Sequence, residues 1–176
     1  MASRLAPVES VLARVNDALS TVYRVLGVGL LLLIVAVVTT NVIGRRFLGA
    51  PVVWSGEAAS FALLWLVFLG ATLGYRRLMF PAFLLGVESL PRRMATTAKL
   101  LVLVVNLGAW ALLVWLGYAF AQESWGQLSP LLGLNRGHVY LIVPLAGVTL
   151  GLMTLEQVVR LLTGKAVATG SRGLDA

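Results

Sequence analysis

Hydrophobic residues are concentrated in four long stretches of the chain that contain no Asp, Glu, Lys, Arg or His. These stretches cover residues 25–44, 58–75, 100–122 and 139–155. A helix that rises about 1.5 Å per residue needs roughly 20 apolar residues to cross a hydrocarbon layer of ~30 Å. All four stretches are near this length and are apolar on every side. The pattern therefore predicts an all-α integral membrane protein with four transmembrane helices.

Two other interpretations of these stretches are weaker. The alternation of apolar and polar residues that marks the strands of a membrane barrel is missing. The first stretch begins too late for an ordinary signal peptide, and Thr39-Thr40-Asn41-Val42 does not form a small-x-small cleavage site. We therefore expect residues 1–165 to form one four-helix membrane domain.

Composition agrees with this class of protein. Hydrophobic residues make up 59% of the chain and charged residues 12%, with a mean hydropathy of +0.92. A soluble domain usually has about a quarter of its residues charged. The chain has no cysteine, so a disulfide framework, a thiolate metal site and a cysteine nucleophile are excluded.

The distribution of positive charge predicts the orientation in the membrane. Most of the 14 Lys and Arg residues lie before the first span, in the second loop and in the C-terminal tail. The first loop contains only Arg45 and Arg46, and the third only Arg136. The positive-inside rule then places both termini in the cytoplasm. Because the charges are dispersed at span ends, we expect no nucleic-acid binding.

Three segments outside the spans have patterns of their own. Residues 8–22 carry an apolar stripe opposite charged residues, which predicts an amphipathic N-terminal helix. This helix either lies in the interface or on a partner and then bends into span one, or simply extends that span. Residues 78–87 are apolar, short and interrupted by Pro81, so we expect a short interfacial segment between spans two and three. Residues 166–176 are small and polar, and we expect a disordered cytoplasmic tail.

The predicted spans lack the side chains that coupling or catalysis needs. No ionisable residue lies near the middle of any span, although proton-coupled carriers usually need a carboxylate or histidine there. The single histidine, His138, is at the rim of span four, and no acidic cluster could hold a metal. We therefore expect neither an enzyme, nor a solitary carrier, nor a bound cofactor or metal.

Small and aromatic residues in the spans predict helix packing. Gly70 and Gly74, and likewise Gly147 and Gly151, lie four residues apart, an arrangement that lets helices approach closely. Trp65 lies inside span two rather than at a rim, so we expect it to fill a contact between helices.

Charged and aromatic residues around the first loop are the candidates for contacts outside the spans. Glu57 begins span two, where a carboxylate is favoured by the helix dipole. Arg45 and Arg46 are close enough in sequence to pair with it and clamp the hairpin. Alternatively, these three residues and Trp54 contact a partner protein.

An ordered set of short motifs resembles a known family. Asn41-Val42-Ile43-Gly44-Arg45-Arg46-Phe47, Trp54-Ser55-Gly56-Glu57 and Trp65-Leu66-Val67-Phe68-Leu69-Gly70-Ala71 are similar to the signature of the DctQ-like small membrane subunit of TRAP transporters, the tripartite ATP-independent periplasmic transporters. Leu90-Pro91 and Tyr140-Leu141-Ile142-Val143-Pro144-Leu145 continue the resemblance, which covers roughly residues 8–162. Many members carry a Gly-His pair after the second span, where this chain has Arg76-Arg77-Leu78.

The resemblance implies a component of a transporter in a bacterial inner membrane. A large permease subunit would carry the substrate and sodium sites, and a periplasmic binding protein would deliver an organic acid-type solute. The small subunit would act as a scaffold in the lipid and help the binding protein to dock. One alternative is a freestanding four-helix membrane protein, either a channel or a small multidrug exporter, the latter needing a Glu in span one. The other is a membrane anchor for another complex.

Overall fold

The computed structural model describes residues 2–47, 49–78 and 92–162. The predicted interfacial segment falls almost wholly outside these ranges, and the predicted disordered tail lies entirely outside them. The helices are α1 (Ala2–Phe47), α2 (Ser55–Leu78), α4 (Arg92–Glu123), α5 (Arg136–Tyr140) and α6 (Ile142–Leu162). No strand occurs in the described ranges, apart from an isolated bridge between Leu128 and Asn135.

Four helical segments are long and apolar enough to span a membrane, as the hydropathy pattern predicts. They are Glu9–Phe47, Ser55–Arg76, Met94–Glu123 and Arg136–Leu161. The fourth includes both α5 and α6. The break at Leu141 has a covalent cause, because Pro144 has no N–H to donate to Tyr140 and its ring crowds that carbonyl.

The N-terminal segment does not form a separate helix. It is the beginning of α1, which continues without interruption into the first span. Its apolar stripe also faces outward, since Val11 and Val22 are 59% and 51% exposed. The polar side of the helix packs inward instead, with Asn16 and Ser20 buried. The structure thus shows the extended-span alternative.

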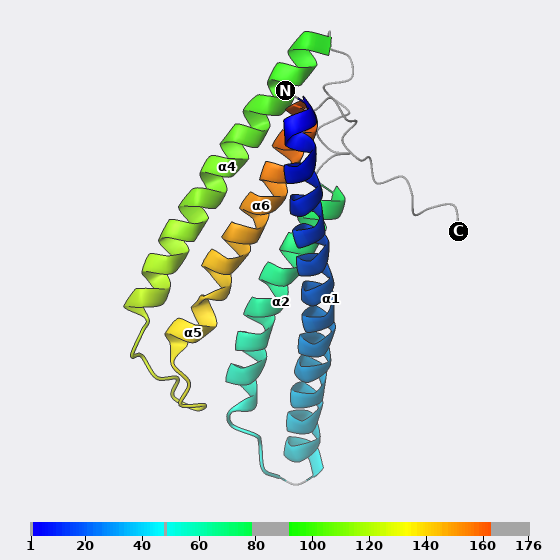
Figure 1. Ribbon diagram of the computed structural model, residues 1–176. Coiled ribbons are helices and arrows are strands. Elements are labelled where there is room, and N and C mark those ends of the chain that lie inside the picture. Colours follow the sequence, from blue (N-terminus) through cyan, green and yellow to red (C-terminus); the bar gives the residue numbers. More distant parts are fainter. Residues whose placement is uncertain (1, 48, 79–91, 163–176) are drawn as a thin grey trace, which may run out of the picture.

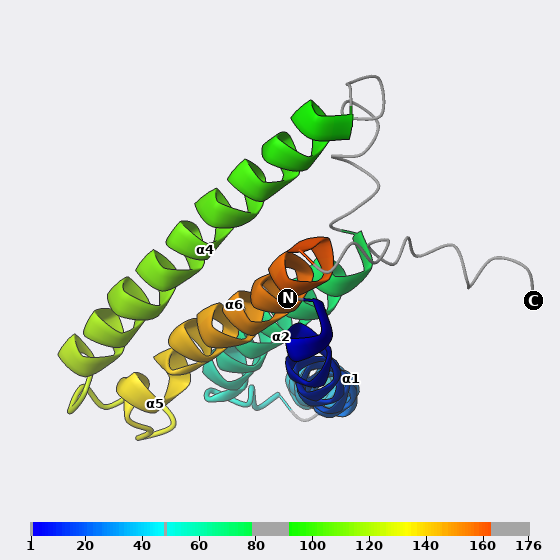
Figure 2. The same ribbon diagram turned by 45° about the horizontal axis from the view of Figure 1, so that its top comes forward.

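α6 lies between α4 and the pair formed by α1 and α2 (Figure 1). α1 and α2 run side by side and both contact α6, while α4 packs mainly along the other side of α6. Figure 2 shows α4 and α1 at opposite edges of this arrangement. The core between α1, α2 and α6 is built on Tyr23, Leu69 and Ile142, all at most 4% exposed. In the most apolar 18-residue stretch of the fourth span, 50% of the residues are buried within the protein. In the corresponding stretch of the first span, 0% are buried.

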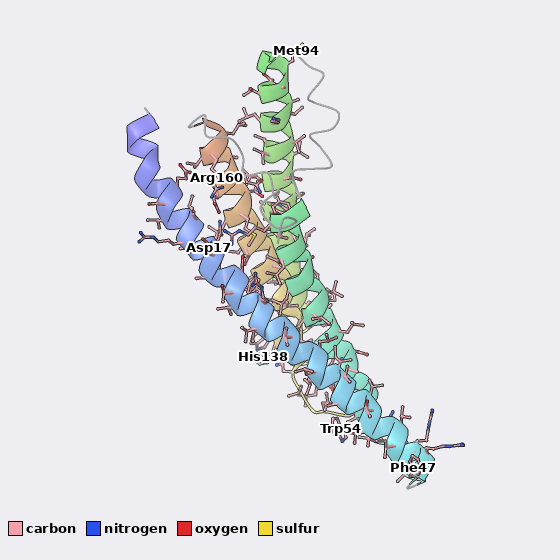
Figure 3. The ribbon with its side chains drawn as sticks, turned by 90° about the vertical axis from the view of Figure 1, so that its right-hand side faces the viewer. Asp17, Phe47, Trp54, Met94, His138 and Arg160 are labelled. Carbon is pink, nitrogen blue, oxygen red and sulfur yellow. The ribbon has the colours of Figure 1, made fainter. Side chains whose placement is uncertain are left out.

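We name the two ends of the bundle along its helix axes. The terminal end holds the beginning of α1 and the end of α6. The hairpin end holds Phe47, residues 49–55 and the third loop, residues 124–135. Figure 3 shows Asp17 and Arg160 toward the terminal end and Phe47 and Trp54 at the hairpin end.

Candidate contact sites at the two ends of the bundle

The hairpin between α1 and α2 is fastened by residues of the first motif. The Oδ1 atom of Asn41 accepts a hydrogen bond from the Val52 N–H at 3.0 Å. Three residues on, the Gly44 carbonyl accepts from the Ala50 N–H at 3.3 Å. A Cβ atom on Gly44 would lie 2.9 Å from the Ala50 carbonyl oxygen, so a larger residue would displace the loop. Asn41 and Gly44 were visible in the motif, but their roles depend on this fold-back.

Glu57 does not form the predicted clamp with Arg45 and Arg46. Its carboxylate reaches the third loop, where Oε2 accepts hydrogen bonds from the N–H groups of Leu131 at 3.0 Å and Leu132 at 3.2 Å. The loop presents these two donors because it closes on itself, with the Ser129 N–H donating to Leu134 at 2.8 Å. Glu57 therefore joins the second span to the third loop rather than to the end of the first.

The arginines are left facing outward as a result. Arg45 and Arg46 are exposed and make no hydrogen bond or ion pair with any described residue. Trp54, which follows the turn of the hairpin, is 46% exposed as well. Arg45, Arg46 and Trp54 are thus all exposed at the hairpin end, whereas Glu57 holds the third loop.

The packing residues divide into two groups. Trp65 donates from Nε1 to the Val139 carbonyl at 2.9 Å, which joins α2 to α5. A Cβ atom on Gly147 would lie 2.8 Å from Val114 Cγ2, so this glycine lets α4 and α6 touch. Around Gly70, Gly74 and Gly151, by contrast, no atom lies within 4 Å of such a Cβ position. These three do not serve the close contacts between described helices that the spacing predicted.

A set of polar residues at the terminal end was not predicted from the sequence. We call it the polar junction, and it consists of Asn16, Asp17, Ser20, Arg76, Glu156 and Arg160. Arg76 of α2 donates to the Asn16 carbonyl and to Ser20 Oγ, each at 2.8 Å, and pairs with Asp17 at 2.6 Å.

The same junction also joins α1 to α6. Glu156, 5% exposed, accepts from the Asn16 side chain at 2.5 Å and pairs with Arg160 at 2.6 Å. The sequence indicated the junction only through charged residues near the ends of the spans. Such residues usually lie in the headgroup region without protein partners, so their position alone does not predict a junction. The junction fixes how far α1 is shifted along α2 and α6.

Hydroxyl groups continue this polar contact into the spans. Tyr23 and Thr149 lie 2.6 Å apart between α1 and α6, and Tyr75 and Thr154 lie 2.6 Å apart between α2 and α6. Trp110 of α4 donates to the same Thr154 Oγ1 at 3.1 Å. Thr154 therefore joins three helices at one atom.

The described residues offer contacts more than chemistry. No group of three His, Cys, Asp or Glu side chains in residues 2–47, 49–78 and 92–162 could hold a metal ion. His138 is exposed, and its ring lies 4.6 Å from that of Trp125.

The fold and its sites define a multi-pass helical membrane protein. A family model for the DctQ component of the tripartite ATP-independent periplasmic transporters matches residues 34–164. The chain belongs to this family and is a small permease component of such a transporter, not a member of an enzyme family. None of the curated proteins compared with the chain matches it.

Proposed function

We propose that this subunit is a scaffold for the large permease subunit of a sodium-coupled importer in a bacterial inner membrane. In this proposal the large subunit binds sodium and an organic acid-type solute. The exposed residues Arg45, Arg46 and Trp54 at the hairpin end lie in the periplasm and help the substrate-binding protein to dock. Both termini are then cytoplasmic, in agreement with the distribution of Lys and Arg.

The observation that carries the proposal is where the carboxylates lie. Asp17 and Glu156 are both held at the terminal end by arginines, and no described carboxylate or histidine lies at mid-depth. A carrier that couples to protons usually needs such a group inside a span. At the same time, most of α1 and α4 is left exposed, which gives a second membrane subunit a large surface to cover.

The test is a detergent pull-down of the tagged chain from its native membrane, with the accompanying chains identified by mass spectrometry. We expect a large polytopic permease in roughly equal amount. Recovery of the chain alone would overturn the scaffold function.

Reconstitution tests the division of labour. In proteoliposomes, the two membrane subunits with the binding protein should show uptake driven by a sodium gradient, and this chain alone should show none. Sodium-driven uptake by this chain alone would show that it is a carrier itself.

A further inference from the structure

Arg24 lies deeper in the bundle than its place in the sequence indicates. It directly precedes the charge-free stretch 25–44, which would place it at the end of a span. Its neighbour Tyr23 is 4% exposed, and the Tyr23 hydroxyl lies 2.6 Å from Thr149 on α6. Thr149 is near the middle of the span Arg136–Leu161. Arg24 therefore leaves α1 near mid-depth of the fourth span.

The polar junction gives a second measure of this depth. Arg76 ends the span of α2 and binds α1 at Asn16 and Ser20. Arg24 follows these two residues by eight and four positions, so it lies about 6–12 Å farther toward the hairpin end. This places Arg24 one to two helical turns inside the level at which the span of α2 ends.

At this depth the guanidinium has no partner in the described chain. The Arg24 side chain is exposed and makes no hydrogen bond or ion pair with a described residue. The nearest carboxylate along α1, that of Asp17, is held by Arg76. Around Arg24 the same surface is apolar, with Val25 67% and Val28 56% exposed. An arginine inside a membrane is unfavourable unless an anion meets it.

We propose that Arg24 is a partner-contact residue whose guanidinium pairs, within the membrane, with a carboxylate on a helix of the large permease subunit. The inference rests on the proposed function, which makes that subunit the neighbour of α1. The first span has 0% of its most apolar window buried in the chain, so α1 has the surface that a partner helix needs. Arginine is also one of the residue types that contribute most to binding at the centre of an interface.

The test uses the intact transporter, purified from native membranes through a tag on this chain. We expect Arg24→Gln to lower recovery of the large subunit at least about tenfold, because it leaves the partner carboxylate unpaired. Arg24→Lys should retain much of the recovery. The matched control is Arg14→Gln, since Arg14 is also exposed on α1 but lies beyond the polar junction.

A photo-crosslinking residue at Val28, one turn from Arg24, identifies the neighbour directly. We expect an adduct with the large subunit, and the same residue placed at Val53, an exposed position in the hairpin, should not crosslink to the same peptide. Equal membrane levels and thermal unfolding of Arg24→Gln and the wild type would exclude misfolding as the cause of a loss.

The outcomes separate the two proposals. If the wild type recovers no large subunit, the proposed function fails and this inference fails with it. If the wild type and Arg24→Gln recover it equally, only the role of Arg24 is refuted. Adducts at Val28 with phospholipid alone would show that Arg24 meets a lipid phosphate instead.

Discussion

At the scale of single residues, hydrogen bonds between side chains and loops determine how the apolar helices fit together. Glu57 and Thr154 show this most directly. Each accepts two hydrogen bonds from elements far away in the sequence. Replacing either residue therefore has a local and predictable effect.

Glu57→Ala should release the third loop. The Leu131 amide loses its acceptor, and the Leu132 amide keeps only Ser129 Oγ at 3.2 Å. Both amides, and Leu131 above all, should exchange with solvent faster in hydrogen–deuterium exchange of the purified protein. Glu123→Ala is the control, since Glu123 is exposed at the end of α4 and accepts from neither amide. Unchanged exchange at both amides in Glu57→Ala would contradict the contact.

Thr154→Val should destabilise the bundle while keeping its shape. Thr154 donates to the Leu150 carbonyl, so Tyr75 and Trp110 are both donors to it. Loss of two hydrogen bonds between helices in a membrane corresponds to about 1–2 kcal/mol in the free energy of unfolding. Unfolding in mixed micelles measures it. Thr39→Val, on an exposed part of α1, should leave the stability near that of the wild type.

At the scale of helices, close contacts and junctions matter more than the glycine pattern itself. Gly147 and Gly151 belong to the same spaced pair, yet only Gly147 touches α4. Which of the two lies in the contact depends on where the helices cross, and this information is not present in the spacing along one helix.

Gly147→Ala and Gly151→Ala should therefore differ. The new methyl group at position 147 would lie 3.2 Å from the Val114 nitrogen and 3.3 Å from the Trp110 carbonyl oxygen, so backbone has to move. We expect a loss of about 1–3 kcal/mol in the free energy of unfolding. Gly151→Ala should be neutral or slightly stabilising in the same unfolding assay. Equal effects would show that α4 and α6 do not meet at Gly147.

The polar junction should depend more on Arg76 than on Asp17. The Asp17 side chain is 70% exposed, and an exposed ion pair contributes only about 0–1 kcal/mol. Arg76 also holds the Asn16 carbonyl and Ser20. Arg76→Ala should consequently destabilise the bundle clearly more than Asp17→Ala, as measured by thermal unfolding in detergent. The reverse order would mean that the ion pair dominates the junction.

At the scale of the whole molecule, the four spans were predictable because lipid requires long apolar helices. The positions of Glu57 and Arg24 were not, for a common reason. Each depends on how far one helix is shifted along another, and hydropathy contains no information on that shift. The resemblance identified the family, but it could not show that the third loop binds Glu57.

The orientation of the chain can be measured because it contains no cysteine of its own. Val53→Cys and Leu128→Cys place single thiols on exposed positions of the hairpin end, and Arg14→Cys places one near the terminal end. A membrane-impermeant maleimide should label the first two in intact spheroplasts and the third only after lysis. Labelling of Arg14→Cys alone in intact spheroplasts would reverse the orientation.

The contacts of α6 with α1, α2 and α4 have a consequence for biosynthesis. α6 is the last helix of the chain, yet α4 packs mainly along it. During translation, which adds roughly 5–20 residues per second from the N-terminus, α1 and α2 can pair as soon as their hairpin is made. α4 has to wait in the membrane until α6 is inserted. A ribosome that stops before residue 142 thus leaves one paired hairpin and one solitary helix in the bilayer, a product that membrane proteases can recognise before any transporter is assembled.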